Sequence, residues 1–213
     1  MTRTGKIWWT LAALSCAGLA IYSYRYFGNL APSATNILGN ALAKPWLWLH
    51  IAGAATALLI GPFQLLPWTR KRFPAAHRIT GRVYVVGCLA GGAGGFIAAF
   101  GSTAGPIATG GFAILALVWI WVNVQGWRAA LARRFPDHRQ WMLRSLSLTF
   151  AAVTLRLYLA IGAIAGLPFV DVYRATAWIS WIPNLILMEL YLRGAFRQRP
   201  KADGMVLITS DAS

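Results

Sequence analysis

Six long apolar runs alternate with short polar segments along the chain, at residues 7–27, 46–68, 79–100, 109–127, 141–167 and 175–192. A helix of about 20 apolar residues spans the hydrocarbon core of a bilayer. The pattern therefore predicts an all-α polytopic membrane protein with six transmembrane helices in one domain, residues 1–193, whose core is 46–167. For the polar segment 194–213 the composition predicts a disordered cytoplasmic tail.

The composition of the chain excludes a water-soluble domain. Only 12% of the residues are charged and 58% are hydrophobic, whereas soluble domains carry about a quarter charged residues. A net charge of +15 is also found in nucleic-acid-binding proteins. Here, however, the basic residues fall in short clusters between the apolar runs. We therefore expect a lipid bilayer and anionic phospholipid headgroups as partners, and no nucleic acid.

The distribution of basic residues predicts the orientation of the helices. With six crossings, sixteen of the twenty Lys and Arg residues fall on one side, and only Arg25, Lys44, Arg156 and Arg174 fall on the other. Cytoplasmic loops carry the excess of Lys and Arg in membrane proteins. The crowded side, with both termini, is therefore predicted to face the cytoplasm.

A short motif occurs twice on this basic side. Residues 71–78 read KRFPAAHR, and residues 133–139 read RRFPDHR. Each copy joins a predicted helix that reaches the cytoplasm to one that leaves it. Helices two-three and four-five are thus predicted to form two parallel hairpins, related by a pseudo-two-fold axis along the membrane normal. The alternative is that both copies are simply a common way to end one helix and begin the next.

The repeated motif contains two of the three histidines. Pro74 and Pro136 suit the first turn of a helix, so His77 and His138 are expected in the first turns of helices three and five. A helix N-terminus disfavours a charged imidazole, and haem iron requires the neutral ring. If the pseudo-two-fold holds, the two rings face each other at one depth. His77 and His138 are therefore candidate ligands of a b-type haem or, less favourably, of copper or zinc.

Other side chains near these histidines suit a planar or anionic ligand. Guanidinium groups bind propionates, phosphates and organic anions through paired hydrogen bonds, and an aromatic ring stacks on a planar group. The candidate binding residues beside the two histidines are Arg78, Arg82, Arg139, Arg144, Gln64 and Trp141. Two hypotheses follow for this site: electron transfer through haem with a quinone as partner, or binding or transport of an anion or lipid headgroup. A structural helper subunit without a cofactor is the third hypothesis.

A secondary site is predicted near the opposite side of the membrane. His50 lies about one turn inside the outer end of helix two, and Arg156 lies in the outer third of helix five. An arginine at that depth pairs with another group or faces a polar cavity. We expect His50, Arg156 and Asn184 to line one outer cavity.

The sequence lacks the residues and motifs that several kinds of catalysis require. The chain has only five Asp and Glu residues in total and contains none of the G-x-S-x-G, H-E-x-x-H or Walker motifs. The sequence therefore contains no hydrolase or kinase motif, and a membrane redox protein is the enzyme class that it leaves as a hypothesis. The glycine-rich segment 91–95 lies inside an apolar run, where it predicts close helix packing and not a phosphate loop.

Four motifs together resemble a known family. They are Trp48-Leu49-His50, Gly61-Pro62-Phe63-Gln64, residues 77–84 (HRITGRVY) and residues 138–145 (HRQWMLRS). In this order, over residues 47–156, they resemble the domain-of-unknown-function 2306 family of bacterial predicted membrane proteins. The resemblance implies a multi-helix domain in the bacterial inner membrane with these His and Arg positions as its signature. It implies no activity, and Leu146 departs from the Tyr that often follows the Arg-Ser pair in the family.

Overall fold

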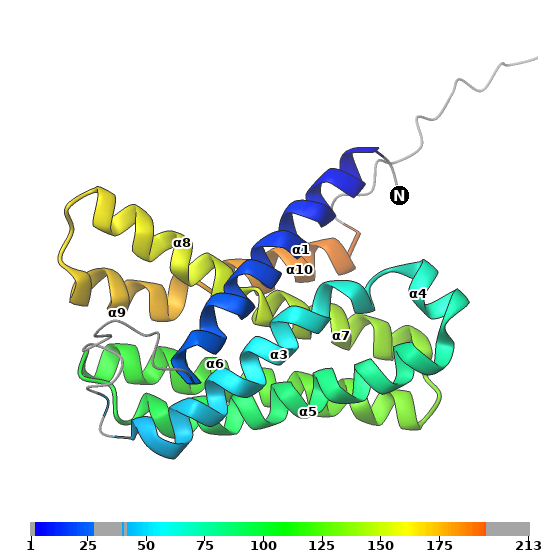
Figure 1. The fold of residues 1–213 in the computed structure, drawn as a ribbon, viewed down its shortest axis with the longest axis horizontal. Helices are drawn as coiled ribbons and strands as arrows, with labels where there is room; N and C mark the ends of the chain where they lie inside the picture. The colour runs from blue at the N-terminus through cyan, green and yellow to red at the C-terminus, as the bar shows by residue number, and fades with distance from the viewer. Residues whose placement is uncertain (1–2, 28–39, 41, 195–213) are drawn as a thin grey trace, which may run out of the picture.

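The secondary structure of the described part of the chain consists of helices joined by turns, with no strand (Figure 1). The computed structural model describes residues 3–27, 40 and 42–194, so the predicted tail lies almost wholly outside the described residues. The elements are α1 (Arg3–Tyr24), η1 (Arg25–Phe27), η2 (Ala43–Leu47), α3 (Trp48–Gln64), α4 (Pro67–Arg72), α5 (Pro74–Ala99), α6 (Pro106–Leu131), α7 (Phe135–Thr149), α8 (Ala151–Ile164), α9 (Phe169–Ile179) and α10 (Ile182–Leu192).

Five stretches of the described chain are long and apolar enough to cross a membrane. They are Gly5–Phe27, Lys44–Gln64, Pro74–Ala99, Pro106–Leu131 and Phe135–Ile164. The sixth predicted run, 175–192, is not one helix, because the chain breaks between α9 and α10 at Ser180 and Trp181. Pro183 lies in the first turn of α10, and a proline clashes with the carbonyl four residues before it. The predicted count of six spanning helices is therefore not confirmed.

The fifth stretch also bends, at Phe150 between α7 and α8. Thr149 Oγ1 donates to the carbonyl of Ser145 at 2.9 Å, a bond to the preceding turn that competes with regular helix geometry. The two interruptions lie against each other. Thr154 Oγ1 of α8 donates to Ser180 O at 2.6 Å, and Asn184 Nδ2 of α10 donates to the same carbonyl at 2.9 Å. The Ser180 carbonyl, which the break before α10 leaves without a helical partner, is thus hydrogen-bonded by a side chain of α8.

Helices α3 and α5 approach each other unusually closely through glycines. A Cβ on Gly53 would lie 2.6 Å from the amide nitrogen of Gly91 and 2.9 Å from its Cα. Both atoms are backbone and cannot yield as a flexible side chain does. The close packing predicted for the glycine-rich segment 91–95 is confirmed, and it brings the backbone of α5 within reach of side chains on α3.

The helices form a main bundle and a smaller pair of helices beside it. Helices α3, α5, α6 and α7 pack around a core that includes Tyr84, Cys88, Trp119 and Leu148. Helix α1 packs on α3, while α8 and α9 lie side by side at the end of the molecule opposite α4 (Figure 1). In this pair α9 packs on α6, whereas α8 packs mainly on α9. The bend at Phe150 therefore carries α8 away from the main bundle.

The predicted hairpin repeat is not confirmed. The first copy of the motif begins in the last turn of a separate short helix, α4, and α5 begins at Pro74. The second copy is a tight turn in which Arg133 adopts a φ of 57°, and α7 begins at Phe135. The two connections share sequence letters but have different local structures.

Candidate ligand-binding cavity

A cavity of about 740 Å³ lies between the main bundle and the α8–α9 pair. Its walls come from α1, α3, α5, α6, α7, α8 and α9, and most of the lining side chains are apolar. The lining also includes six aromatic residues: Tyr22, Tyr26, Phe112, Trp119, Phe169 and Tyr173. The space exists because α8 bends away from the bundle. We call it the His50–Arg156 cavity, after the two lining side chains that carry its chemistry.

His50 is held in one orientation by the backbone of α5. Its Nδ1 lies 2.8 Å from the carbonyl oxygen of Gly91. A carbonyl oxygen only accepts, so Nδ1 carries the proton and the neutral ring presents the lone pair of Nε2. A Cβ on Gly95 would lie 2.7 Å from Nδ1, so the ring fits only because that position is glycine. The close approach of α3 and α5 thus sets the tautomer of His50.

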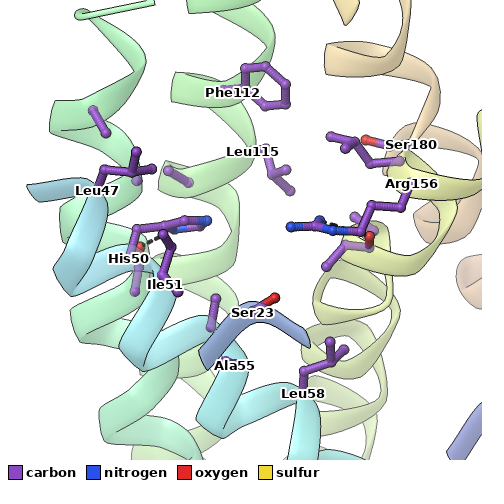
Figure 2. Close-up of a pocket in the computed structure, with 18 of the residues that line it drawn as sticks. Ser23, Leu47, His50, Ile51, Ala55, Leu58, Phe112, Leu115, Arg156 and Ser180 are labelled. Atoms are coloured by element: carbon purple, nitrogen blue, oxygen red, sulfur yellow. Dashed lines mark hydrogen bonds between the residues drawn. The ribbon is translucent and has the colours of Figure 1, made fainter. Parts of the chain in front are cut away.

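Arg156 faces His50 from the opposite wall of the cavity. Figure 2 shows its guanidinium group on α8 pointing toward the imidazole on α3. Within the described residues, its hydrogen bond is to the carbonyl of Ala152, at 3.2 Å, in the preceding turn of the same helix. The ion pairs in the described part of the chain involve Arg134, Arg144 and Arg174, and none involves Arg156. Arg156 is therefore a cation deep in an apolar helix whose charge no carboxylate of the described chain offsets.

The structure brings together two of the three residues expected at this site. His50 and Arg156 both line the cavity, whereas Asn184 is not among the lining residues. Asn184 instead donates to Ser180 O and Thr154 Oγ1 at the paired helix breaks. Because the sixth run breaks between α9 and α10, Asn184 stabilises the break and does not reach the cavity. In the apolar pattern of 175–192, Pro183 is the only sign of this break.

The two predicted haem ligands occupy equivalent positions at the arginine-rich end of the bundle. His77 and His138 are each the fourth residue of their helix, α5 and α7. His138 Nδ1 lies 2.8 Å from Gly126 O, which leaves Nε2 free in the neutral ring. His77 Nδ1 is buried and has no hydrogen-bond partner among the described residues.

Half of the other predicted site residues at this end are engaged in contacts between or within helices. Arg144 donates from Nε and Nη2 to the carboxylate of Glu189 on α10, at 2.5 and 3.0 Å, and lies over the ring of Trp141. Gln64 donates to Thr80 Oγ1 at 2.6 Å. The remaining guanidinium groups are exposed: Arg78, Arg82 and Arg139. No cluster of three or more His, Cys, Asp or Glu side chains able to hold a metal occurs among the residues that the structure describes.

A second polar cluster in the core had not been predicted. Tyr84, Asn123, Ser145 and Thr149 are buried together and hydrogen-bonded to one another, and Trp119 donates to Thr149. The signal available in the sequence was Asn123 within the most apolar run and the alternation of polar residues at 145, 147 and 149. Neither signal indicates which helices meet.

The fold and the cavity define a polytopic helical membrane protein with polar groups inside its apolar body. The chain belongs to the DUF2306 family, described as predicted membrane proteins, whose sequence profile matches residues 47–192. The resemblance inferred from the four motifs is therefore confirmed, and the match continues past residue 156 through α10. It includes both His50 and Arg156, whereas α1 lies outside it. No curated protein and no solved structure matches the chain.

Proposed function

We propose that this protein binds a lipid-soluble molecule in the His50–Arg156 cavity, with Arg156 donating hydrogen bonds to an oxygen atom of the ligand's head. The observation that carries the proposal is the Arg156 guanidinium group, which faces a cavity of about 740 Å³ without a carboxylate partner among the described residues. A charge inside a membrane is costly unless it is paired. A ligand oxygen that is negative, or carries partial negative charge, would offset that cost.

The walls of the cavity support a ligand with an apolar body. Apolar pockets with a few placed polar groups are the usual form of small-molecule sites. Aromatic side chains such as Phe112, Trp119 and Tyr173 suit a ring or an alkyl chain. A carboxylate and a quinone carbonyl share the acceptor chemistry that Arg156 requires, so both classes are tested.

The test compares the purified wild-type protein with Arg156→Gln by isothermal titration calorimetry in detergent. The two probes are decanoate and a decyl-substituted benzoquinone. We expect at least one probe to bind wild type and to lose about tenfold or more in affinity in the variant, since a charge-assisted hydrogen bond contributes about 1.5–3 kcal/mol.

Arg139→Gln is the matched control, because Arg139 is an exposed arginine of the same bent helix and lies outside the cavity. It should bind the probes as wild type does. Failure of both probes to bind wild type, or full affinity in Arg156→Gln, would overturn the proposal and favour a structural helper role.

A b-type haem between His77 and His138 is the second candidate function, with a quinone as electron partner. Its support is the hydrogen bond from His138 Nδ1 to Gly126 O, the usual arrangement of a metal-ligating histidine, together with the unpartnered Nδ1 of His77. The haem would supply one-electron chemistry, and exposed Arg78, Arg82 and Arg139 would bind its propionates. A sharp α band in the dithionite-reduced spectrum, lost in His77→Ala or His138→Ala, is expected. Colourless protein from haem-replete cells, with no copper or zinc by metal analysis, would remove this candidate.

We also propose that the arginine-rich end faces the cytoplasm of a bacterial inner membrane. The basis is the excess of Lys and Arg at that end. A membrane-impermeant maleimide should label Thr103→Cys, in the turn between α5 and α6, in intact cells. It should leave Gln140→Cys on α7 unlabelled until the cells are opened; the reverse pattern would invert the topology.

A further inference from the structure

We infer that the ligand of the His50–Arg156 cavity is a lipid-soluble hydroquinone-class molecule, an aromatic ring with oxygens on opposite edges, one donating to His50 and the other accepting from Arg156. This inference rests on the proposed function and deepens it. It uses a second feature of the cavity: one of the two facing side chains donates hydrogen bonds and the other accepts them.

The first step is the state of the His50 ring. Because Nδ1 is bound to Gly91 O at 2.8 Å, the only ring nitrogen left for a ligand is Nε2. The Arg156 guanidinium faces the ring (Figure 2), so a second positive charge there would be repelled across an apolar space. In the neutral ring Nε2 is an acceptor only.

The second step is the complementarity of the two walls. Arg156 only donates hydrogen bonds and His50 Nε2 only accepts them. A ligand that reaches both must carry an oxygen acceptor at one end and an O–H or N–H donor at the other. A carboxylate or a quinone offers acceptors alone, so either would place a lone pair against the lone pair of Nε2. A hydroquinone satisfies both walls.

The third step is the shape and composition of the space between the two groups. His50 lies on α3 and Arg156 on α8, on opposite sides of the cavity (Figure 2), whose lining is mostly apolar and includes aromatic side chains. A rigid ring with oxygens on opposite edges presents a polar group to each wall and an apolar body to the rest. Ring faces also stack favourably on aromatic side chains such as Trp119 and Tyr173.

The experiment titrates three matched probes into the full-length protein under anaerobic conditions. They are a decyl-substituted benzohydroquinone, the corresponding benzoquinone, and the dimethyl ether of the hydroquinone, which has the same ring but no O–H. We expect the hydroquinone to bind about three- to tenfold more tightly than the other two, the effect of one added hydrogen bond.

His50→Asn is the decisive variant. Its side-chain amide can keep a donor to Gly91 O but supplies no acceptor at the position of Nε2, so the preference for the hydroquinone should disappear while quinone binding persists. A second variant, Gly95→Ala, should displace the ring and reduce the preference in the same direction, because its Cβ would lie 2.7 Å from Nδ1.

The outcomes separate this inference from the proposed function. Equal, Arg156-dependent affinity for all three probes would overturn the inference and leave the proposed function standing. A preference that survives in His50→Asn would also overturn it. If none of the three probes binds the wild-type protein, both the inference and the proposed function are overturned.

Discussion

Two groups of polar side chains lie next to each other inside this apolar protein, and they differ in one respect. In the first group, the Tyr84 cluster of Tyr84, Asn123, Ser145, Thr149 and Trp119, every side chain is hydrogen-bonded to another. Tyr84 Oη lies 2.8 Å from Ser145 Oγ, and Ser145 donates to Asn123 Oδ1 at 2.9 Å. In the His50–Arg156 cavity the guanidinium group instead bonds, among the described residues, only the Ala152 carbonyl of its own helix, and it faces His50 across the cavity (Figure 2). Trp119 and Thr149 belong to both regions, so the closed cluster forms part of the cavity wall.

The difference supports the proposal that the cavity is a ligand site and the Tyr84 cluster is part of the scaffold. A fully satisfied buried network makes packing specific and has no capacity left for a ligand. A cation inside an apolar protein is costly unless its charge is paired, and Arg156 has no carboxylate partner in the described chain. The Tyr84 cluster thus stabilises the packing, and the unpaired charge of Arg156 supports the proposal that the cavity binds a ligand. Substitutions in the two regions should therefore have separable effects.

The largest effect is expected from Gly53→Ala, which disrupts the close contact between α3 and α5 on which both regions depend. Its Cβ would lie 2.6 Å from Gly91 N, so α3 and α5 must separate. We expect a loss of about 3 kcal/mol in the free energy of unfolding, the upper range for overpacking. Denaturant unfolding in micelles measures it. Gly110→Ala is the control, because its Cβ would meet only Trp178 at an ordinary 3.7 Å; equal stability of the two variants would contradict the prediction.

Asn123→Ala should have an intermediate effect confined to stability. It leaves the Ser145 hydroxyl without its acceptor and removes a buried side chain, at a cost of about 2 kcal/mol. The midpoint of unfolding should fall, while titration with the benzoquinone probe should give the wild-type affinity. A selective loss of ligand affinity in a variant of unchanged stability would abolish the distinction between the two regions.

The smallest effect, and the one of opposite sign, is expected from Arg156→Gln. Removal of an uncompensated charge from the membrane interior should raise the free energy of unfolding by about 1 kcal/mol in the absence of ligand. Arg144→Gln provides the contrast, because it breaks the ion pair with Glu189 and should lower stability. If Arg156→Gln destabilises the ligand-free protein as Arg144→Gln does, Arg156 has a structural partner and the cavity is not an unpaired site.

Much of the architecture was determined by local sequence. Apolar length and the scarcity of charge predicted membrane-spanning helices, and the family motifs were recognisable as they stand. Pro74 and Pro136 placed His77 and His138 in first turns, because proline favours that position whatever the rest of the fold does. The glycines at 91–95 predicted close packing, because a helix face without side chains admits a neighbouring backbone.

Only the tertiary structure decided which polar groups are satisfied. Arg144, expected to bind a ligand, is paired with Glu189, 45 residues away along the chain, and His50 is oriented by Gly91, 41 residues away. Arg156 has no such partner in the described chain, although its sequence context is no more distinctive than that of Arg144. Hydropathy and helix start signals act over one or two turns. Hydrogen-bond satisfaction depends on the relative positions of whole helices, and here on bends at Phe150 and Ser180 that open a cavity between them.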